Sequence, residues 1–171
     1  MSGFYSEADY ENSIIELFQN LGYTYVYGPN IERDFSSPLY DEVLEDSLQR
    51  LNKGLPYDAI KEALFKLCNF ENGTLVAKNA VFMDYLQNGI PVRYFEKGEE
   101  RSAIVYLADY KNPDNNSFIA ANQWTFVENF EKRADVILFL NGLPVVLVEL
   151  KSPSREETDA SEAFLQLRNY M

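Results

Sequence analysis

The fold is decided by the sequence LPVVLVELK at residues 143–151, which follows ADVILFL at residues 134–140. Both segments are rich in Val, Ile and Leu, and Asn141-Gly142 between them is typical of a β-hairpin turn. They therefore predict two adjacent antiparallel strands. Because residues 143–151 are apolar at odd and even positions alike, we expect this strand to be central, with both faces covered.

Strand-like segments also precede this hairpin. Residues 92–95, 103–108 and 118–126 are rich in Val, Ile, Phe and Tyr, and turn-rich stretches separate them. Together with the hairpin they predict an antiparallel meander over about residues 91–151.

Helical patterns lie on both sides of the meander. An apolar spacing of i, i+3, i+4, i+7 predicts a helix over about residues 8–21, formed around Ile14, Leu17, Phe18 and Leu21. Similar patterns predict helices over about residues 39–51, 56–67 and 75–88, and Ser154-Arg155-Glu156-Glu157 has the form of a capping box that opens a last helix over about 155–171. The predicted fold class is α+β or α/β, with a mixed, largely antiparallel central sheet flanked by helices and an added helical segment.

Length and composition set further limits. A chain of 171 residues fits one domain, residues 1–171, with a helical part over about 8–89; its end at Met171 in mid-helix suggests a fragment of a longer chain. The absence of histidine excludes Ser–His and Cys–His nucleophile pairs. Cys68 is the only cysteine and is expected to be a small core residue. No signal peptide or membrane-spanning segment is evident, so we expect a cytoplasmic protein.

The net charge of −12, from 15 Lys and Arg against 27 Asp and Glu, argues against unspecific phosphate binding over the whole surface. It leaves open a local nucleic-acid cleft, or a basic partner that supplies most of the DNA contact.

One group of residues carries chemistry. Glu149 and Lys151 lie two positions apart at the end of the last predicted strand, and Asp135 lies at the start of the strand before it. This spacing is typical of metal-dependent phosphodiesterases, in which two carboxylates hold Mg²⁺ and a lysine orients or deprotonates the attacking water or stabilises developing charge. The alternative interpretation is a solvated Glu149–Lys151 salt bridge with Asp135 as a turn residue.

The hairpin must bring both carboxylates to one face of the sheet. A regular two-residue turn at Asn141-Gly142 would place Asp135 across from Val148, which would put Asp135 and Glu149 on opposite faces. A three-residue loop or a β-bulge would instead place Asp135 across from Glu149. We therefore predict an odd-length loop or a bulge between these strands.

Accessory residues are expected on the two terminal helices. Gln166 and Tyr170 stand at i and i+4 on one face of the last helix, although Tyr170 is equally compatible with packing under the sheet. On the first helix Glu7 and Glu11 lie one turn apart, and either would bring a further carboxylate near the site.

Longer stretches of the chain resemble a known family. The segment from Arg133 through Asn141-Gly142 to Pro153, the run Asn122-Gln123-Trp124-Thr125 and the opening Ser6-Glu7-Ala8 are similar to the nuclease domain at the N-terminus of the restriction (motor) subunit of type I restriction–modification enzymes. The likeness is densest from about residue 80 onward, and residues 35–69 add little to it. Ala134 stands where many members have Pro.

The resemblance implies a restriction-endonuclease-like PD-(D/E)xK nuclease in which Asp135, Glu149 and Lys151 are catalytic, and Asp135 and Glu149, with the Leu150 carbonyl, hold Mg²⁺ or its substitute Mn²⁺. Gln166 and Tyr170 would form the accessory Q-x-x-x-Y motif, and Glu7 matches the family's opening motif better than Glu11. The implied partners are double-stranded DNA and the methyltransferase and specificity subunits.

The same resemblance implies ATP-driven translocation only through motor domains that this sequence lacks, since no phosphate-loop motif occurs in it. Two alternatives stay open: a stand-alone or repair nuclease of the same superfamily, and a nuclease-like fold that serves only as a docking module.

Overall fold

The computed structural model describes residues 6–71, 73–127, 130–151 and 160–169. Its elements divide into two compact units, one formed by residues 1–40 and 118–171 and the other by residues 41–117. The interpretation of residues 1–171 as a single nuclease domain stays a prediction. No described helix is long and apolar enough to cross a membrane.

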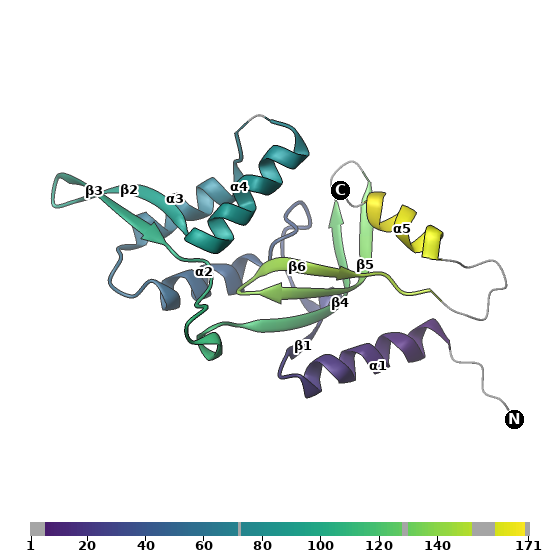
Figure 1. Ribbon diagram of the computed structural model, residues 1–171. Coiled ribbons are helices and arrows are strands. Elements are labelled where there is room, and N and C mark those ends of the chain that lie inside the picture. Colours follow the sequence, from purple (N-terminus) through teal and green to yellow (C-terminus); the bar gives the residue numbers. More distant parts are fainter. Residues whose placement is uncertain (1–5, 72, 128–129, 152–159, 170–171) are drawn as a thin grey trace, which may run out of the picture. The chain divides into compact units, whose positions relative to one another are not determined.

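The first unit contains a four-stranded mixed sheet in the order β1-β4-β5-β6 (Figure 1). Its strands are β1 (Thr24–Tyr27), β4 (Phe118–Val127), β5 (Glu131–Leu140) and β6 (Leu143–Val148). The last three form an antiparallel meander, while β1 runs parallel to β4. This arrangement confirms the predicted mixed, largely antiparallel sheet with helices.

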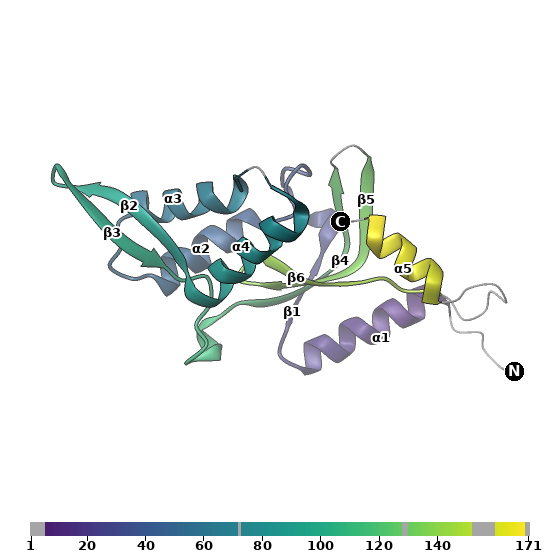
Figure 2. The same ribbon diagram turned by 45° about the horizontal axis from the view of Figure 1, so that its top comes forward.

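Helices lie on both faces of this sheet (Figure 2). On one face Ile15 of α1 (Glu7–Asn20) packs against residues Ala120, Val136 and Leu138. On the other face, Leu167 of α5 (Ala160–Asn169) lies beside Ile137 and Leu147. Ile137 alternates along β5 with Val136 and Leu138 and therefore points to the face opposite α1. A capping box between Ser6 and Asp9 fixes the start of α1.

The hairpin between β5 and β6 contains the predicted irregularity. Leu140 pairs with Leu143 across a two-residue turn, in which Asn141 and Gly142 have φ of 53° and 84°. Phe139 then pairs with Pro144, but Leu138 pairs with Val146, so Val145 is the extra residue of a β-bulge. The prediction of an odd-length loop or a bulge is confirmed in the form of a bulge, and the three-residue loop does not form.

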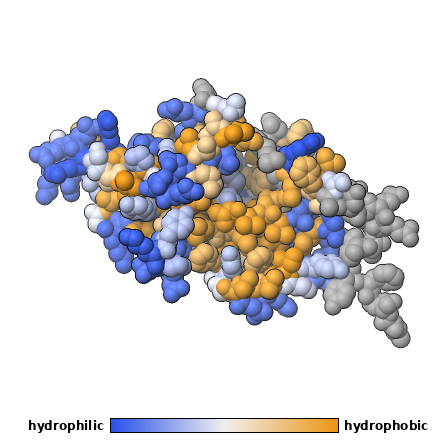
Figure 3. Space-filling view, in the orientation of Figure 1, coloured by the Kyte–Doolittle hydropathy of each residue, from blue (hydrophilic) through white to orange (hydrophobic). Residues whose placement is uncertain are grey.

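The position of β6 differs from the prediction. It forms one edge of the described sheet, and Val145 and Val146 are 43% and 45% exposed, so the expectation of a central strand covered on both faces is wrong for the described residues. The apolar sequence alone does not reveal this, because a buried strand and an uncovered apolar edge have the same composition. Figure 3 shows the resulting hydrophobic surface where β6 runs.

The second unit is mainly helical. It contains α2 (Asp41–Leu51), α3 (Tyr57–Cys68), α4 (Leu75–Asn88) and a separate hairpin of β2 (Ile90–Glu96) and β3 (Glu99–Val105). The hairpin packs on α3 around buried apolar side chains, including Leu44, Leu48, Ile60, Leu67, Ile90, Val92 and Val105. The four helices predicted before the meander are thus confirmed within a few residues.

Two sequence predictions in this region are wrong. The predicted meander over residues 91–151 is not continuous, because β2 and β3 pair only with each other and β4 begins after residues 106–117. Cys68 is exposed at the end of α3, whereas a core position was expected. Apolar neighbours in the sequence do not determine whether a small residue in the last turn of a helix faces the core or the solvent.

Candidate active site

The bulged hairpin brings the two predicted metal-binding carboxylates together. Val136 pairs with Val148, so the next position along the ladder places Asp135 across from Glu149. Asp135 acts on Glu149 both as a nearby negative charge and as a hydrogen-bond partner. The two carboxyl groups therefore share one region at the end of the β5–β6 pair.

The backbone and Lys151 complete this arrangement. The Leu150 amide donates a hydrogen bond of 2.7 Å to Asp135 Oδ2, and Lys151 Nζ donates one of 2.8 Å to Glu149 Oε1. The Glu149 side chain is only 2% exposed, whereas the Lys151 side chain is 25% exposed. The structure thus brings Asp135, Glu149 and Lys151 together, and the Glu149 side chain is more deeply buried than that of Lys151.

Burial and charge act on both partners of the ion pair. Burial raises the pKa of Glu149, the Asp135 charge raises it further, and Lys151 opposes both effects. Burial of Lys151 lowers its pKa by disfavouring the charged form. The hydrogen bond to Glu149 and the negative charges of Glu149, Asp135 and Glu7 act in the opposite direction. The pKa of Lys151 is therefore raised above its ordinary value. Among the described residues, the carboxylates of Glu149, Asp135 and Glu7 thus all stabilise the charged form of Lys151.

The first helix approaches this group. Glu7 is exposed in the first turn of α1, and its charge contributes to the raised pKa of Lys151. Figures 1 and 2 show the start of α1 beside the segment that follows β6. Glu11, one turn later, is held elsewhere: its Oε1 accepts a 2.6 Å hydrogen bond from Asn122 Nδ2, and its Oε2 accepts one of 2.7 Å from Gln123 Nε2.

Asn122 and Gln123 had no role assigned from the sequence. The Asn122 side chain also accepts a 3.1 Å hydrogen bond from the Tyr25 hydroxyl through its Oδ1. The available signal was the occurrence of two adjacent amide side chains within an otherwise apolar strand, where polar groups require partners. Tyr25 gave no signal, because the short strand β1 was not predicted.

The accessory motif lies partly outside the described residues. Gln166 belongs to α5, and its side chain is outside the described part of the structure, as are Tyr170 and the capping-box segment at Ser154. Their assignment to the site stays a prediction.

The donor set fits a hard divalent cation. Two carboxylates lie together, Glu149 is almost fully buried, and oxygen ligands are what Mg²⁺ prefers. Within the described ranges no group of three or more acidic or cysteine side chains is placed to hold a metal ion.

The chain matches the family model described as "Type I restriction enzyme R protein N terminus" over residues 4–171. That match covers nearly all 171 residues.

The chain belongs to this family.

Relatives of this R-protein N-terminal chain have corresponding names. The type I restriction enzyme HindI endonuclease subunit of Haemophilus influenzae is 33% identical over 175 residues, which cover 96% of this chain and 17% of that protein. The MjaIXP endonuclease subunit of Methanocaldococcus jannaschii is 28% identical over 164 residues, covering 90% of this chain and 16% of the relative. The chain thus spans about a sixth of these relatives and corresponds to their N-terminal region.

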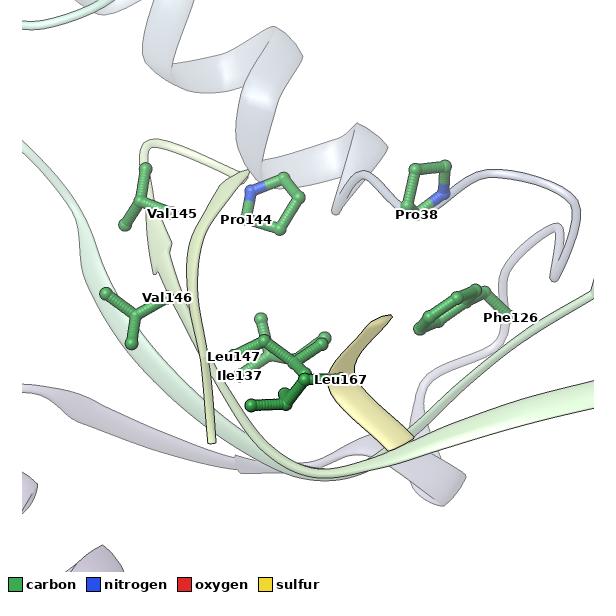
Figure 4. A pocket seen from close by; sticks show the side chains of 8 residues that line it. All are labelled: Pro38, Phe126, Ile137, Pro144, Val145, Val146, Leu147 and Leu167. Atoms are coloured by element: carbon green, nitrogen blue, oxygen red, sulfur yellow. The ribbon is translucent and has the colours of Figure 1, made fainter. Parts of the chain in front are cut away.

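A separate cleft in this R-protein N-terminal chain is apolar. It encloses about 390 Å³. Figure 4 labels the side chains that line it, which are Pro38, Phe126, Ile137, Pro144, Val145, Val146, Leu147 and Leu167. None of these side chains is titratable, and none is among the predicted site residues. The chemistry is therefore expected at Asp135, Glu149 and Lys151, where the charged groups gather.

Proposed function

We propose that this chain is the endonuclease domain of a type I restriction subunit and hydrolyses phosphodiester bonds of double-stranded DNA with Mg²⁺. The observation that carries the proposal is the convergence of Asp135, Glu149 and Lys151 at the end of the bulged hairpin. Family membership supports the assignment to the restriction subunit.

Each residue has a role in this proposal. Asp135 and Glu149, with the Leu150 carbonyl, would hold Mg²⁺ or Mn²⁺, which when bound lowers the pKa of water and neutralises phosphate charge. Lys151 would orient or deprotonate the attacking water, or stabilise developing charge.

The remaining parts of the enzyme would supply what this chain lacks. Domains beyond this region would drive translocation with ATP, and methyltransferase and specificity subunits would select the DNA site. Partners that carry positive charge would also compensate for the net charge of −12 on this chain.

Metal binding tests the site directly. Asp135→Ala is expected to weaken Mn²⁺ binding at least about tenfold, because one of two carboxylate ligands is lost. Isothermal titration calorimetry on the 171-residue chain measures this effect. Asp46→Ala, which removes an exposed carboxylate from α2, serves as the matched control and should bind Mn²⁺ like the wild type. Equal binding by Asp135→Ala and the wild type would refute the ligand assignment.

A further inference from the structure

Gln123 has an unusual backbone for a residue inside a strand. Its φ is 52°, whereas the other described non-glycine residues with positive φ, Lys97 and Asn141, lie in the turns of the two hairpins. The left-handed region costs a residue with a side chain about 1–2 kcal/mol, so the surroundings must stabilise it.

This turned backbone lies directly beside the candidate metal ligand. Asn122 pairs with Val136 and Trp124 pairs with Ala134, but the intervening pair of Gln123 and Asp135 is missing from the ladder. The distortion of β4 thus faces Asp135 on β5.

The opposite side of the distortion is closely packed. The parallel ladder of β1 ends where Tyr27 pairs with Asn122, and Gly28 follows. A Cβ atom added to Gly28 would lie 2.7 Å from the Asn122 carbonyl oxygen and 3.1 Å from that of Gln123. Only glycine permits this approach, so the sheet accommodates the turned backbone on both sides.

The side chains show what the turn achieves. In a regular strand, neighbouring side chains point to opposite faces, yet Asn122 and Gln123 both donate to the Glu11 carboxylate of α1. Val136 and Leu138 of β5 pack toward α1, and Phe139, which lies three and one positions after them, points to the other face of the sheet. Trp124 packs against Phe139 with ring centroids 4.8 Å apart. The turn at Gln123 therefore lets β4 change the face to which its residues point.

From this geometry we propose that Glu11 and Gln123 are positioning residues for Asp135. The hydrogen bond between Gln123 Nε2 and Glu11 Oε2 holds β4 in the turned conformation across from Asp135, and so sets the place of the Asp135 carboxylate. Glu11 acts through Gln123 and is not itself a metal ligand. The proposal rests on the proposed function only in its consequence for metal binding.

Three variants of the 171-residue chain test this arrangement. Gln123→Glu keeps the size of the side chain but places its carboxylate against that of Glu11, so the two repel each other and the hydrogen bond is lost. The exchange Glu11→Gln with Gln123→Glu restores an amide–carboxylate pair. Glu11→Gln alone preserves the contact, because the Gln123 amide can turn to accept a hydrogen bond from the new one.

Two measurements follow each variant. Mn²⁺ titration is expected to show about tenfold weaker binding for Gln123→Glu, as for other residues that orient metal ligands, and binding within about twofold of wild type for the exchange and for Glu11→Gln. The Leu150 amide, which donates to Asp135 Oδ2, reports the same displacement without metal. Its NMR shift and hydrogen-exchange rate should change in Gln123→Glu and return in the exchange.

Distinct outcomes would overturn the proposal. An unchanged Leu150 amide in Gln123→Glu would remove the positioning role, and loss of Mn²⁺ binding in Glu11→Gln with an unchanged amide would make Glu11 a ligand. If the wild type binds no Mn²⁺, the proposed function fails while the amide still decides the positioning role. Should Gln123→Glu not fold, Gln123→Gly replaces it, because glycine tolerates positive φ but lacks the amide.

Discussion

Lys151→Ala is expected to abolish DNA cleavage by the full restriction complex while ATP hydrolysis and DNA binding continue. Lys151 Nζ donates a hydrogen bond to the buried Glu149 carboxylate, and a positioned charge or proton donor contributes on the order of 10²–10⁴-fold to such reactions. Cleavage of a DNA substrate with a recognition site and ATPase activity should be measured on the same preparation.

Two comparisons separate chemistry from structure in this experiment. Lys132→Ala removes a lysine of β5 that is not among the candidate site residues and should cleave like the wild type. Mn²⁺ binding by Lys151→Ala should persist, since both carboxylates remain. A variant that also lost ATP-driven translocation would assign Lys151 a structural role instead.

Trp124→Ala is expected to lower the free energy of unfolding by about 3–5 kcal/mol, as large core truncations do. The Trp124 side chain is fully buried, its ring centroid lies 5.3 Å from that of Tyr40 and 4.8 Å from that of Phe139, and the Arg33 guanidinium lies 3.9 Å from its ring centroid. Removing the ring would leave a cavity under β4 and β5. Trp124 is the only tryptophan, so the variant lacks tryptophan fluorescence. Urea unfolding monitored by circular dichroism therefore measures the change in the free energy of unfolding.

Two control variants make this prediction specific. Within the described part of the chain, Trp124 Nε1 is buried without a hydrogen-bond partner, so Trp124→Phe keeps most of the packing and removes a costly donor. It should cost clearly less than Trp124→Ala. Phe130→Ala, at a side chain that is 78% exposed, should change stability by no more than about 0.5 kcal/mol. Equal losses for Trp124→Ala and Phe130→Ala would show that Trp124 is not a core residue.

Prediction from the sequence succeeded where short-range patterns decide the structure. Apolar spacing predicted the first helix, which spans residues 7–20. Gly22 predicted its end, and this glycine has a φ of 94° in the structure. An odd-length loop or a bulge was predicted in the β5–β6 hairpin, because a regular two-residue turn at Asn141-Gly142 would put the two carboxylates on opposite faces. The constraint came from the chemistry of two carboxylates sharing one cation, and the extra residue that it requires is Val145.

The sequence by itself determined the local elements and the spacing of Asp135, Glu149 and Lys151, because periodicity and turn chemistry act over a few residues. Only the tertiary structure decided that β1 joins β4 in parallel, that the hairpin of β2 and β3 forms its own sheet, and that β6 lies at the edge of the described sheet. It also decided the contact of Glu11 with Asn122 and Gln123, which are 111 and 112 positions away in the chain. Such contacts depend on how distant elements pack, and no pattern within one segment encodes them.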